Sequence, residues 1–447
     1  MYSPRQKILW FAFSTRVILI LLQAISNLII PDHDANVFLS PEDPNLRKTH
    51  ADIVVDKLLG GMKRWDAQYF IHIAQYGYTY ENCLAFFPLF PLVVRYVAYG
   101  LNSLFGTFLN FHSTLLISAT LLNVIIFIKS ADILHRLSLR ILRSECRAYK
   151  SAILYCINPA SIFFSAPYSE SLFAWMSFYT MFKCTESETL RFANIDILSG
   201  LPAGFSMITR SNGSLILPFL LLPLFTSFVS LFLTMIIALL PFLLVQTYNY
   251  LKYCVHSEHN LPDFLSNTEY VLPGSAESPW CNNSLPLSYS YIQSNYWNVG
   301  FFRYYKLKQI PNFILAAPII LLVMYPCLSY VMCNIRLCFR FGLKTSVIGY
   351  SNKMPYRPKQ YSKCFGANDP TMFVYIVHML FLCVFCIIFV HIQVSTRLLA
   401  SASPIFKWKT FLISRRMPDF QSRMIQYYFI GYYFIGTILF SNFYPWT

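Results

Sequence analysis

Charged residues are scarce in this sequence. Only 12% of its 447 residues are Asp, Glu, Lys or Arg, whereas soluble domains carry about a quarter. Apolar residues make up 56% of the chain and aromatic residues 18%. This deficit of charge excludes an ordinary soluble domain and predicts an all-α polytopic membrane protein.

Several other features are missing. The chain has no His-Glu-x-x-His motif, and its one Cys-x-x-Cys pair, Cys383 and Cys386, lies in an apolar run without a second pair to complete a metal site. No internal repeat and no separate soluble segment is visible, so we predict one membrane-embedded domain over residues 1–447. The net charge of +15 is typical of cytosolic loops rich in Lys and Arg, which argues against a nucleic-acid partner.

Apolar runs near the roughly 20 residues needed to cross a bilayer recur along the chain. No small-residue cleavage site follows the first run, so we expect a membrane helix there rather than a signal peptide. The run at 215–245 fits one tilted helix or two short ones. The expected spans are residues 8–30, 84–105, 113–131, 148–165, 169–184, 195–208, 215–245, 311–335, 371–393 and 425–443.

Two long polar segments, residues 31–83 and 246–310, interrupt the apolar runs. Lys and Arg are concentrated in residues 135–150 and 336–363, and the positive-inside rule places both in the cytosol and the two polar segments on the lumenal side. For both basic loops to be cytosolic, residues 84–105 must form a partial or hairpin element rather than a full span. Otherwise the basic loop at 135–150 is lumenal.

An oxidising lumen favours disulfide bonds between cysteines of the polar segments. Cys83 ends the first polar segment and Cys281 lies in the second, so these two are candidates for a disulfide. The remaining cysteines are expected to be small packing residues of the membrane helices.

Residues 61–78, GMKRWDAQYFIHIAQYGY, place a carboxylate among aromatic rings beside the membrane. One interpretation is an interfacial helix in which Asp66 begins the helix and Trp65 lies among the lipid headgroups. The other makes Asp66 a general base at the membrane surface.

Two further motifs carry charge next to apolar runs. In NPASIFFSAPYSESLFAW, Glu170 follows a Pro-Tyr-Ser turn, where it either supports a helix start or takes part in function. In TRSNG, Arg210 either extends to the interface or binds a phosphate.

The successive motifs RWDAQYFIHIAQYGYTYENCLAFFPLFP, NPASIFFSAPYSESLFA, TRSNG, PWCNNSLPLSYSYIQSNYWNVGFFRYYKLKQIPNFILAAP and QVSTRLLASASP resemble those of the PIG-V family, in the same order, over residues 61–404. The resemblance implies a GT-C-like multi-helix membrane bundle with a lumenal active site. It also implies an α1,6-mannosyltransferase of the endoplasmic reticulum that adds the second mannose to the glycosylphosphatidylinositol (GPI) precursor. The implied donor is dolichol-phosphate-mannose, and Asp66 matches the acidic residue of the first lumenal loop.

This chemistry needs one base for the acceptor hydroxyl and positive charge near the leaving phosphate. Arginine recognises phosphate bidentately, and aromatic rings stack on sugars or form an interfacial belt. No cofactor is expected, and the Asp-His-Asp of residues 32–34 fits a solvated loop better than a metal site. Besides Asp66, the predicted substrate-binding residues are Trp65, His72, Glu170, Arg210, Trp280, Tyr296, Trp297, Arg303 and Arg397.

Two other functions remain open. A GT-C enzyme with a different acceptor would share the same chemistry. A lipid transporter or scramblase would also keep polar groups among membrane helices, but the acidic candidate lies in a loop and no inverted repeat is present.

Overall fold

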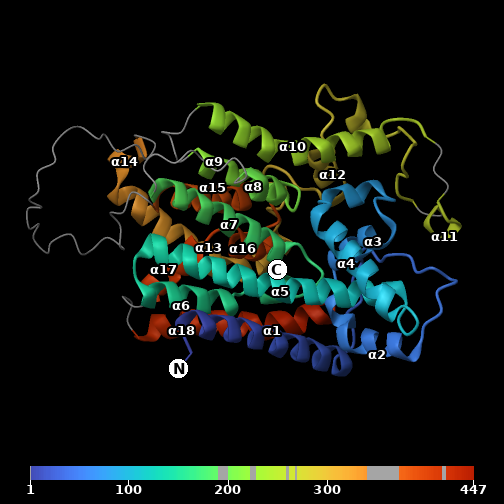
Figure 1. Ribbon diagram of the computed structural model, residues 1–447, viewed down its shortest axis with the longest axis horizontal. Helices are drawn as coiled ribbons and strands as arrows, with labels where there is room; N and C mark the ends of the chain where they lie inside the picture. The colour runs from blue at the N-terminus through green and yellow to red at the C-terminus, as the bar shows by residue number, and fades with distance from the viewer. Residues whose placement is uncertain are drawn as a thin grey trace, which may run out of the picture.

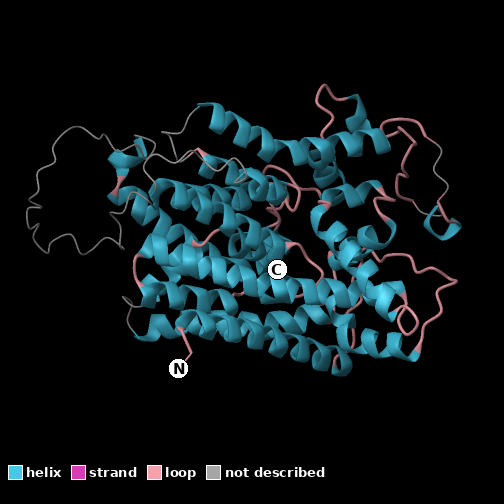
Figure 2. Ribbon diagram, in the orientation of Figure 1, coloured by secondary structure: helices cyan, strands magenta, loops and turns pink. Residues whose placement is uncertain are grey.

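The computed structural model describes residues 2–189, 200–221, 228–257, 261–266, 269–339, 372–414 and 419–446. Long helices lie side by side in one bundle, with the N-terminus at one end of it (Figure 1). None of the described residues forms a β-strand (Figure 2). The prediction of an all-α protein is therefore confirmed.

Four of the described helices are long and apolar enough to cross a membrane. They are α1 (Pro4–Ile29), α5 (Phe111–Leu142), α10 (Phe228–Tyr253) and α13 (Ile310–Cys333). Two shorter apolar helices are α4 (Leu89–Phe105) and α15 (Phe373–Phe389). These elements agree with a multi-pass membrane protein.

The other described elements are shorter or less apolar. The α-helices are α2 (His50–Leu59), α3 (Ala67–Tyr76), α6 (Glu145–Cys156), α7 (Glu170–Thr189), α8 (Gly200–Met207), α9 (Leu217–Leu220), α11 (Asp263–Ser266), α12 (Ser288–Trp297), α14 (Ile335–Phe339), α16 (Ser395–Ala402), α17 (Ile405–Ser414) and α18 (Asp419–Ser441). The 3-10 turns are η1 (Gly60–Met62), η2 (Glu81–Ala85), η3 (Ser161–Phe164), η5 (Ser211–Ile216), η6 (Pro279–Asn282), η7 (Leu307–Gln309) and η10 (Ile392–Val394).

Helix α5 lies at the centre of the bundle and packs against α1, α4, α6 and α7. Asn110 caps its start by accepting a hydrogen bond from the backbone N of Ser113 at 2.8 Å. Its end is marked by Arg143 in the left-handed conformation, with φ of 49°. The expected basic loop at 135–150 is therefore wrong: most of it belongs to α5 and α6, which turn at residues 143–144.

The chain between α6 and α7 is an irregular segment buried inside the bundle. Helix α6 ends at Cys156, so the span expected at 148–165 is interrupted. Pro159 comes three residues later, and proline disfavours the helical conformation at the residue before it, Asn158. Ser165 and Tyr168 are both buried, which places the Pro-Tyr-Ser-Glu turn within the protein rather than in an exposed loop.

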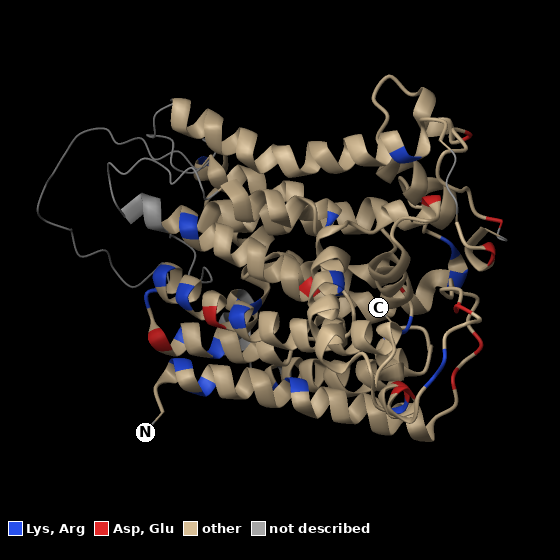
Figure 3. Ribbon diagram, turned by 45° about the vertical axis from the view of Figure 1, so that its right-hand side comes forward, with Lys and Arg blue, Asp and Glu red and all other residues tan. Residues whose placement is uncertain are grey.

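The two ends of the bundle differ in composition. Lys and Arg gather at the end that holds the N-terminus, and most Asp and Glu lie at the opposite end (Figure 3). At that opposite end, α4 packs against α3 (Figure 1), which fits a partial element at 84–105. Most of the second predicted basic loop, 336–363, lies outside the described residues.

Candidate active site

Asp66 stands at the start of α3. Its backbone occupies the N-cap position, yet its side chain makes no capping hydrogen bond. The preceding Trp65 has φ of 56°, in the left-handed region where a bulky residue is strained. The simple capping role considered for Asp66 therefore does not describe this carboxylate.

The carboxylate of Asp66 instead belongs to a chain of alternating charges. Oδ2 of Asp66 lies 2.7 Å from Nη1 of Arg397, and Nε of Arg397 lies 4.0 Å from Oε1 of Glu170. The same oxygen of Glu170 is in direct contact with Nη1 of Arg210. We call these four side chains the charge cluster. Four of the residues predicted from the sequence thus come together from four separate segments.

The members of the charge cluster differ in exposure. The side chain of Glu170 is 0% exposed and that of Asp66 is 29% exposed, with the two arginines in between. Asp66 is therefore the carboxylate that a substrate can reach, whereas Glu170 contacts arginines in the interior. Burial by itself would lower the pKa of Arg397. The negative charges of Asp66 and Glu170 outweigh burial and raise this pKa above its usual value, so Arg397 stays charged.

Aromatic rings surround the guanidinium of Arg397. Its Cζ lies 5.4 Å from the ring centroid of Phe163 and 5.6 Å from that of Tyr168, within range of a cation–π contact. The Tyr168 hydroxyl donates to the backbone carbonyl of Arg64 at 3.3 Å, and burial raises the pKa of Tyr168 well above its usual value. Tyr168 therefore stays neutral and ties the α6–α7 segment to the segment before Asp66.

The TRSNG motif forms the tight turn that presents Arg210. A Cβ on Gly213 would lie 2.2 Å from the carbonyl oxygen of Ser206. Only glycine therefore fits here, because the backbone at 213 passes so close to the backbone of Ser206. Arg210 occupies the N-cap of η5. The Ser211 hydroxyl donates to the hydroxyl oxygen of Tyr289 at 2.8 Å, which links the turn to α12.

Four side chains within two residues of a charge-cluster member have buried polar atoms without a hydrogen-bond partner among the described residues. The atoms are Nε1 of Trp65, both amide atoms of Asn212 and the hydroxyl groups of Ser395 and Thr396. Unpaired buried polar groups are costly and rare, so these atoms are candidates to bind a polar substrate. The sequence reasoning missed Asn212, Ser395 and Thr396, although TRSNG and QVSTR contain them.

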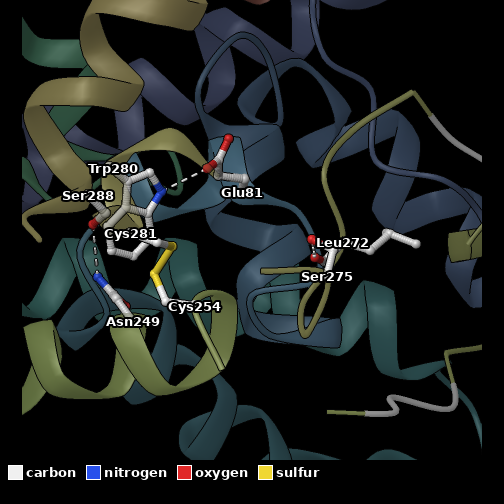
Figure 4. Close-up of a disulfide and its surroundings, with 8 residues drawn as sticks. All are labelled: Glu81, Asn249, Cys254, Leu272, Ser275, Trp280, Cys281 and Ser288. Atoms are coloured by element: carbon white, nitrogen blue, oxygen red, sulfur yellow. Dashed lines mark hydrogen bonds between the residues drawn. A yellow bond between two sulfur atoms is a disulfide. The ribbon is translucent and has the colours of Figure 1, made fainter. Parts of the chain in front are cut away.

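A second buried carboxylate, Glu81, joins the two long polar segments. It accepts a hydrogen bond from Nε1 of Trp280 at 2.8 Å (Figure 4). The hydroxyl of Tyr296 donates a second one, also at 2.8 Å. Trp280 is 0% exposed, so it has no ring face open to a sugar. Trp297, which is half-buried, packs edge-on against Tyr69 with ring centroids 5.9 Å apart.

A disulfide in the second polar segment joins Cys254 to Cys281, with Cα atoms 5.4 Å apart (Figure 4). Cys83, the partner considered for Cys281, is a free buried thiol. That pairing is therefore wrong. Burial raises the pKa of the Cys83 thiol, and this residue packs within the aromatic core around Glu81.

The two remaining candidates lie apart from the charge cluster. His72 is buried and bonded to Ser40 Oγ at 2.8 Å and to Thr79 Oγ1 at 2.6 Å. Burial lowers its pKa to about 3, so it is a neutral structural residue. Arg303 is exposed and donates to Ser294 Oγ at 2.7 Å.

No group of three His, Cys, Asp or Glu is placed to hold a metal ion in the described part of the chain. Asp32, the first carboxylate of the Asp-His-Asp motif, instead pairs with Arg64 at 2.8 Å.

Two relatives are similar to this chain over most of its length. "GPI mannosyltransferase 2" of Drosophila pseudoobscura pseudoobscura is 37% identical, covering 99% of this chain and 100% of the relative. "GPI alpha-1,6-mannosyltransferase 2" of Homo sapiens is 39% identical, covering 90% of this chain and 83% of the relative.

Among solved structures, an Archaeoglobus fulgidus oligosaccharyltransferase is similar over 97% of this chain and 53% of its own, with 13% identity and a TM-score of 0.44. A likeness this weak supports no closer comparison. By sequence, the profile of the family described as "Mannosyltransferase (PIG-V)" matches residues 5–447. The chain therefore belongs to the PIG-V mannosyltransferase family.

Proposed function

We propose that this protein transfers mannose from dolichol-phosphate-mannose to the first mannose of a GPI precursor, forming an α1,6 linkage. The names of its relatives support the acceptor and the linkage. The observation that carries the proposal is the ion pair of Asp66 and Arg397. It supports the proposal because a carboxylate able to take a proton from a sugar hydroxyl lies beside a guanidinium suited to a phosphate.

In this scheme Asp66 takes the proton of the acceptor 6-hydroxyl. The oxygen attacks C1 of the donor mannose, a C–O bond forms, and the bond from C1 to the phosphate oxygen breaks. Its electron pair leaves with dolichol phosphate, so the configuration at C1 is inverted if the donor is β-linked. A positioned general base contributes roughly 10²–10⁴-fold to such a step.

Arg397 and Arg210 are proposed to bind the donor phosphate. Both guanidinium groups contact Glu170, which fixes their separation, and arginine matches phosphate with two parallel hydrogen bonds. Arg397 is paired with Asp66 in the structure. A phosphate that draws Arg397 away leaves the carboxylate free to accept a proton, so donor binding and activation of the base are linked.

We further propose that the protein resides in the endoplasmic reticulum membrane with this site facing the lumen. The disulfide of Cys254 and Cys281 supports an oxidising compartment for the second polar segment. Glu81 ties that segment to the first, and the two segments therefore face the same side.

The direct test is transfer by the purified protein in lipid nanodiscs. Dolichol-phosphate-mannose and a monomannosylated GPI precursor are added, and a dimannosylated product sensitive to an α1,6-specific mannosidase is expected. A parallel reaction with a dimannosylated precursor tests acceptor choice and should give no product. Absence of transfer to the first precursor, or a product with another linkage, would overturn the proposal.

A further inference from the structure

Lys407 places a buried amine near the start of α17. Its side chain is fully buried, and no carboxylate among the described residues pairs with it. Removing an ammonium group from water is expensive when no opposite charge compensates it. The groups that Lys407 does contact therefore indicate what it stabilises.

Those contacts are the carbonyl groups at the end of α16. Nζ of Lys407 donates to the backbone oxygen of Ala400 and, at 3.2 Å, to that of Ser403. The last four carbonyls of a helix lack intrahelical partners and carry the negative end of its dipole. Lys407 is thus a side-chain cap for α16, the helix that carries Arg397.

A stack of aromatic rings connects this cap to the irregular segment between α6 and α7. Nζ of Lys407 lies 5.2 Å from the ring centroid of Tyr155, which stacks on Phe127 at 4.9 Å. Cζ of Arg16 lies 4.0 Å from the Phe127 centroid. Arg16 in turn donates to the carbonyls of Cys156 and Ser161, at 2.9 and 2.8 Å, in the segment that leads to Glu170.

We propose that Lys407 is a positioning residue for mannose transfer and that it acts through Arg397. Helix α16 has eight residues and is about 12 Å long. Loss of its C-terminal cap lets the whole helix tilt, which moves Arg397 relative to Asp66 and to the donor phosphate. This inference rests on the proposed function, because it assigns Lys407 a part in the geometry of that site.

Lys407→Met is the first variant, since it keeps the length and apolar body of the side chain and removes the amine that donates to the carbonyls of Ala400 and Ser403. A displacement of about 1 Å in a reacting group costs roughly 10²-fold, so kcat/KM for the donor should fall by about that factor per folded molecule. The affinity for dolichol phosphate, measured by direct binding, should fall as well.

Trp408→Phe is the matched control. Trp408 is the next residue of α17, is buried, and donates from Nε1 to Ser138 Oγ at 2.6 Å. Its replacement removes a buried hydrogen bond of the same helix without touching the end of α16. We expect a lower melting temperature and wild-type kcat/KM.

A double-mutant cycle separates positioning from general stability. In an Arg397→Lys background the geometry of the guanidinium is already lost, so Lys407→Met should cost much less than in the wild type. An equal cost in both backgrounds would show that Lys407 does not act through Arg397. Wild-type activity of Lys407→Met would also overturn the inference.

Two further results complete the test. If Lys407→Met does not fold, Lys407→Gln, which keeps a donor for the carbonyls, takes its place in the cycle; failure of both to fold assigns Lys407 to stability alone and overturns the inference. The wild-type protein is assayed in parallel. Absence of mannose transfer by the wild type counts against the proposed function, and dolichol phosphate binding then tests Lys407 independently.

Discussion

Replacing Asp66 by Asn removes the basic oxygen while nearly preserving the shape of the side chain. The amide oxygen can still accept a hydrogen bond from Nη1 of Arg397, which lies 2.7 Å from the carboxylate in the structure. A general base contributes roughly 10²–10⁴-fold. We therefore expect turnover to fall by about that range, which corresponds to about 3–5 kcal/mol in the activation free energy.

The same change should cost little folding stability. The side chain of Asp66 is 29% exposed, and it makes no capping hydrogen bond that Asn would have to replace. Partly exposed ion pairs contribute about 0–1 kcal/mol, and Arg397 keeps its contact with Glu170. The free energy of unfolding should thus fall by no more than about 1 kcal/mol.

The assay is mannose transfer by equal amounts of folded protein, with Asp32→Asn as the matched control. Asp32 pairs with Arg64 at 2.8 Å and its side chain is 44% exposed, so this control removes a similar ion pair outside the charge cluster. It should retain activity. Asp66→Glu should recover little, because a shift of about 1 Å costs roughly 10²-fold. Comparable rates for wild type and Asp66→Asn would refute the role of Asp66.

Three other predictions concern separate parts of the structure. Arg397→Lys keeps the charge but loses the planar fork, so we expect at least about a tenfold loss of kcat/KM for the donor; near-normal activity would mean that charge alone suffices. Burial lowers the pKa of His72 to about 3, against about 6.5 in an unfolded chain. The unfolded state therefore takes up the proton first as the pH falls, and stability contributed by neutral His72 is fully present above pH 6.5 and lost between about pH 6.5 and pH 3. Thermal unfolding should show a dependence of up to about 2 kcal/mol between pH 6.5 and pH 5 that is reduced in His72→Gln, and an unchanged dependence would contradict this. Non-reducing peptide mapping should find Cys254 linked to Cys281, and Cys254→Ser should lower stability by about 2–4 kcal/mol; a peptide linking Cys83 to Cys281 would be the opposite result.

The helices were largely predictable because the apolar runs are long. The expected spans at 8–30, 311–335 and 371–393 agree closely with α1, α13 and α15. The interruption after Cys156 was not predicted, since residues 162–164 continue the apolar run although they form a 3-10 turn. Hydropathy reports burial, and a buried irregular segment has the same hydropathy as a buried helix.

The charge cluster was predictable in its members but not in its pairing. Asp66, Glu170, Arg210 and Arg397 each stand out because charge is rare in this chain, and a rare charge near the membrane needs a partner. Which carboxylate meets which arginine depends on contacts between segments far apart in sequence, and no local spacing encodes these. The contacts of Glu81 were not predictable for the same reason: its partners Trp280 and Tyr296 lie about 200 residues away in the chain.

The balance of charge in the cluster has a consequence for the end of the catalytic cycle. Two carboxylates and two arginines sum to zero, and the proposed donor, dolichol-phosphate-mannose, is a phosphodiester with one negative charge. Transfer of mannose turns it into a monoester, whose second ionisation near pH 6 adds most of another charge at neutral pH. The product thus binds the arginines more strongly than the substrate does. Under the proposed function, dolichol phosphate therefore competes with the donor for the two arginines, and its concentration in the membrane limits how much donor is bound.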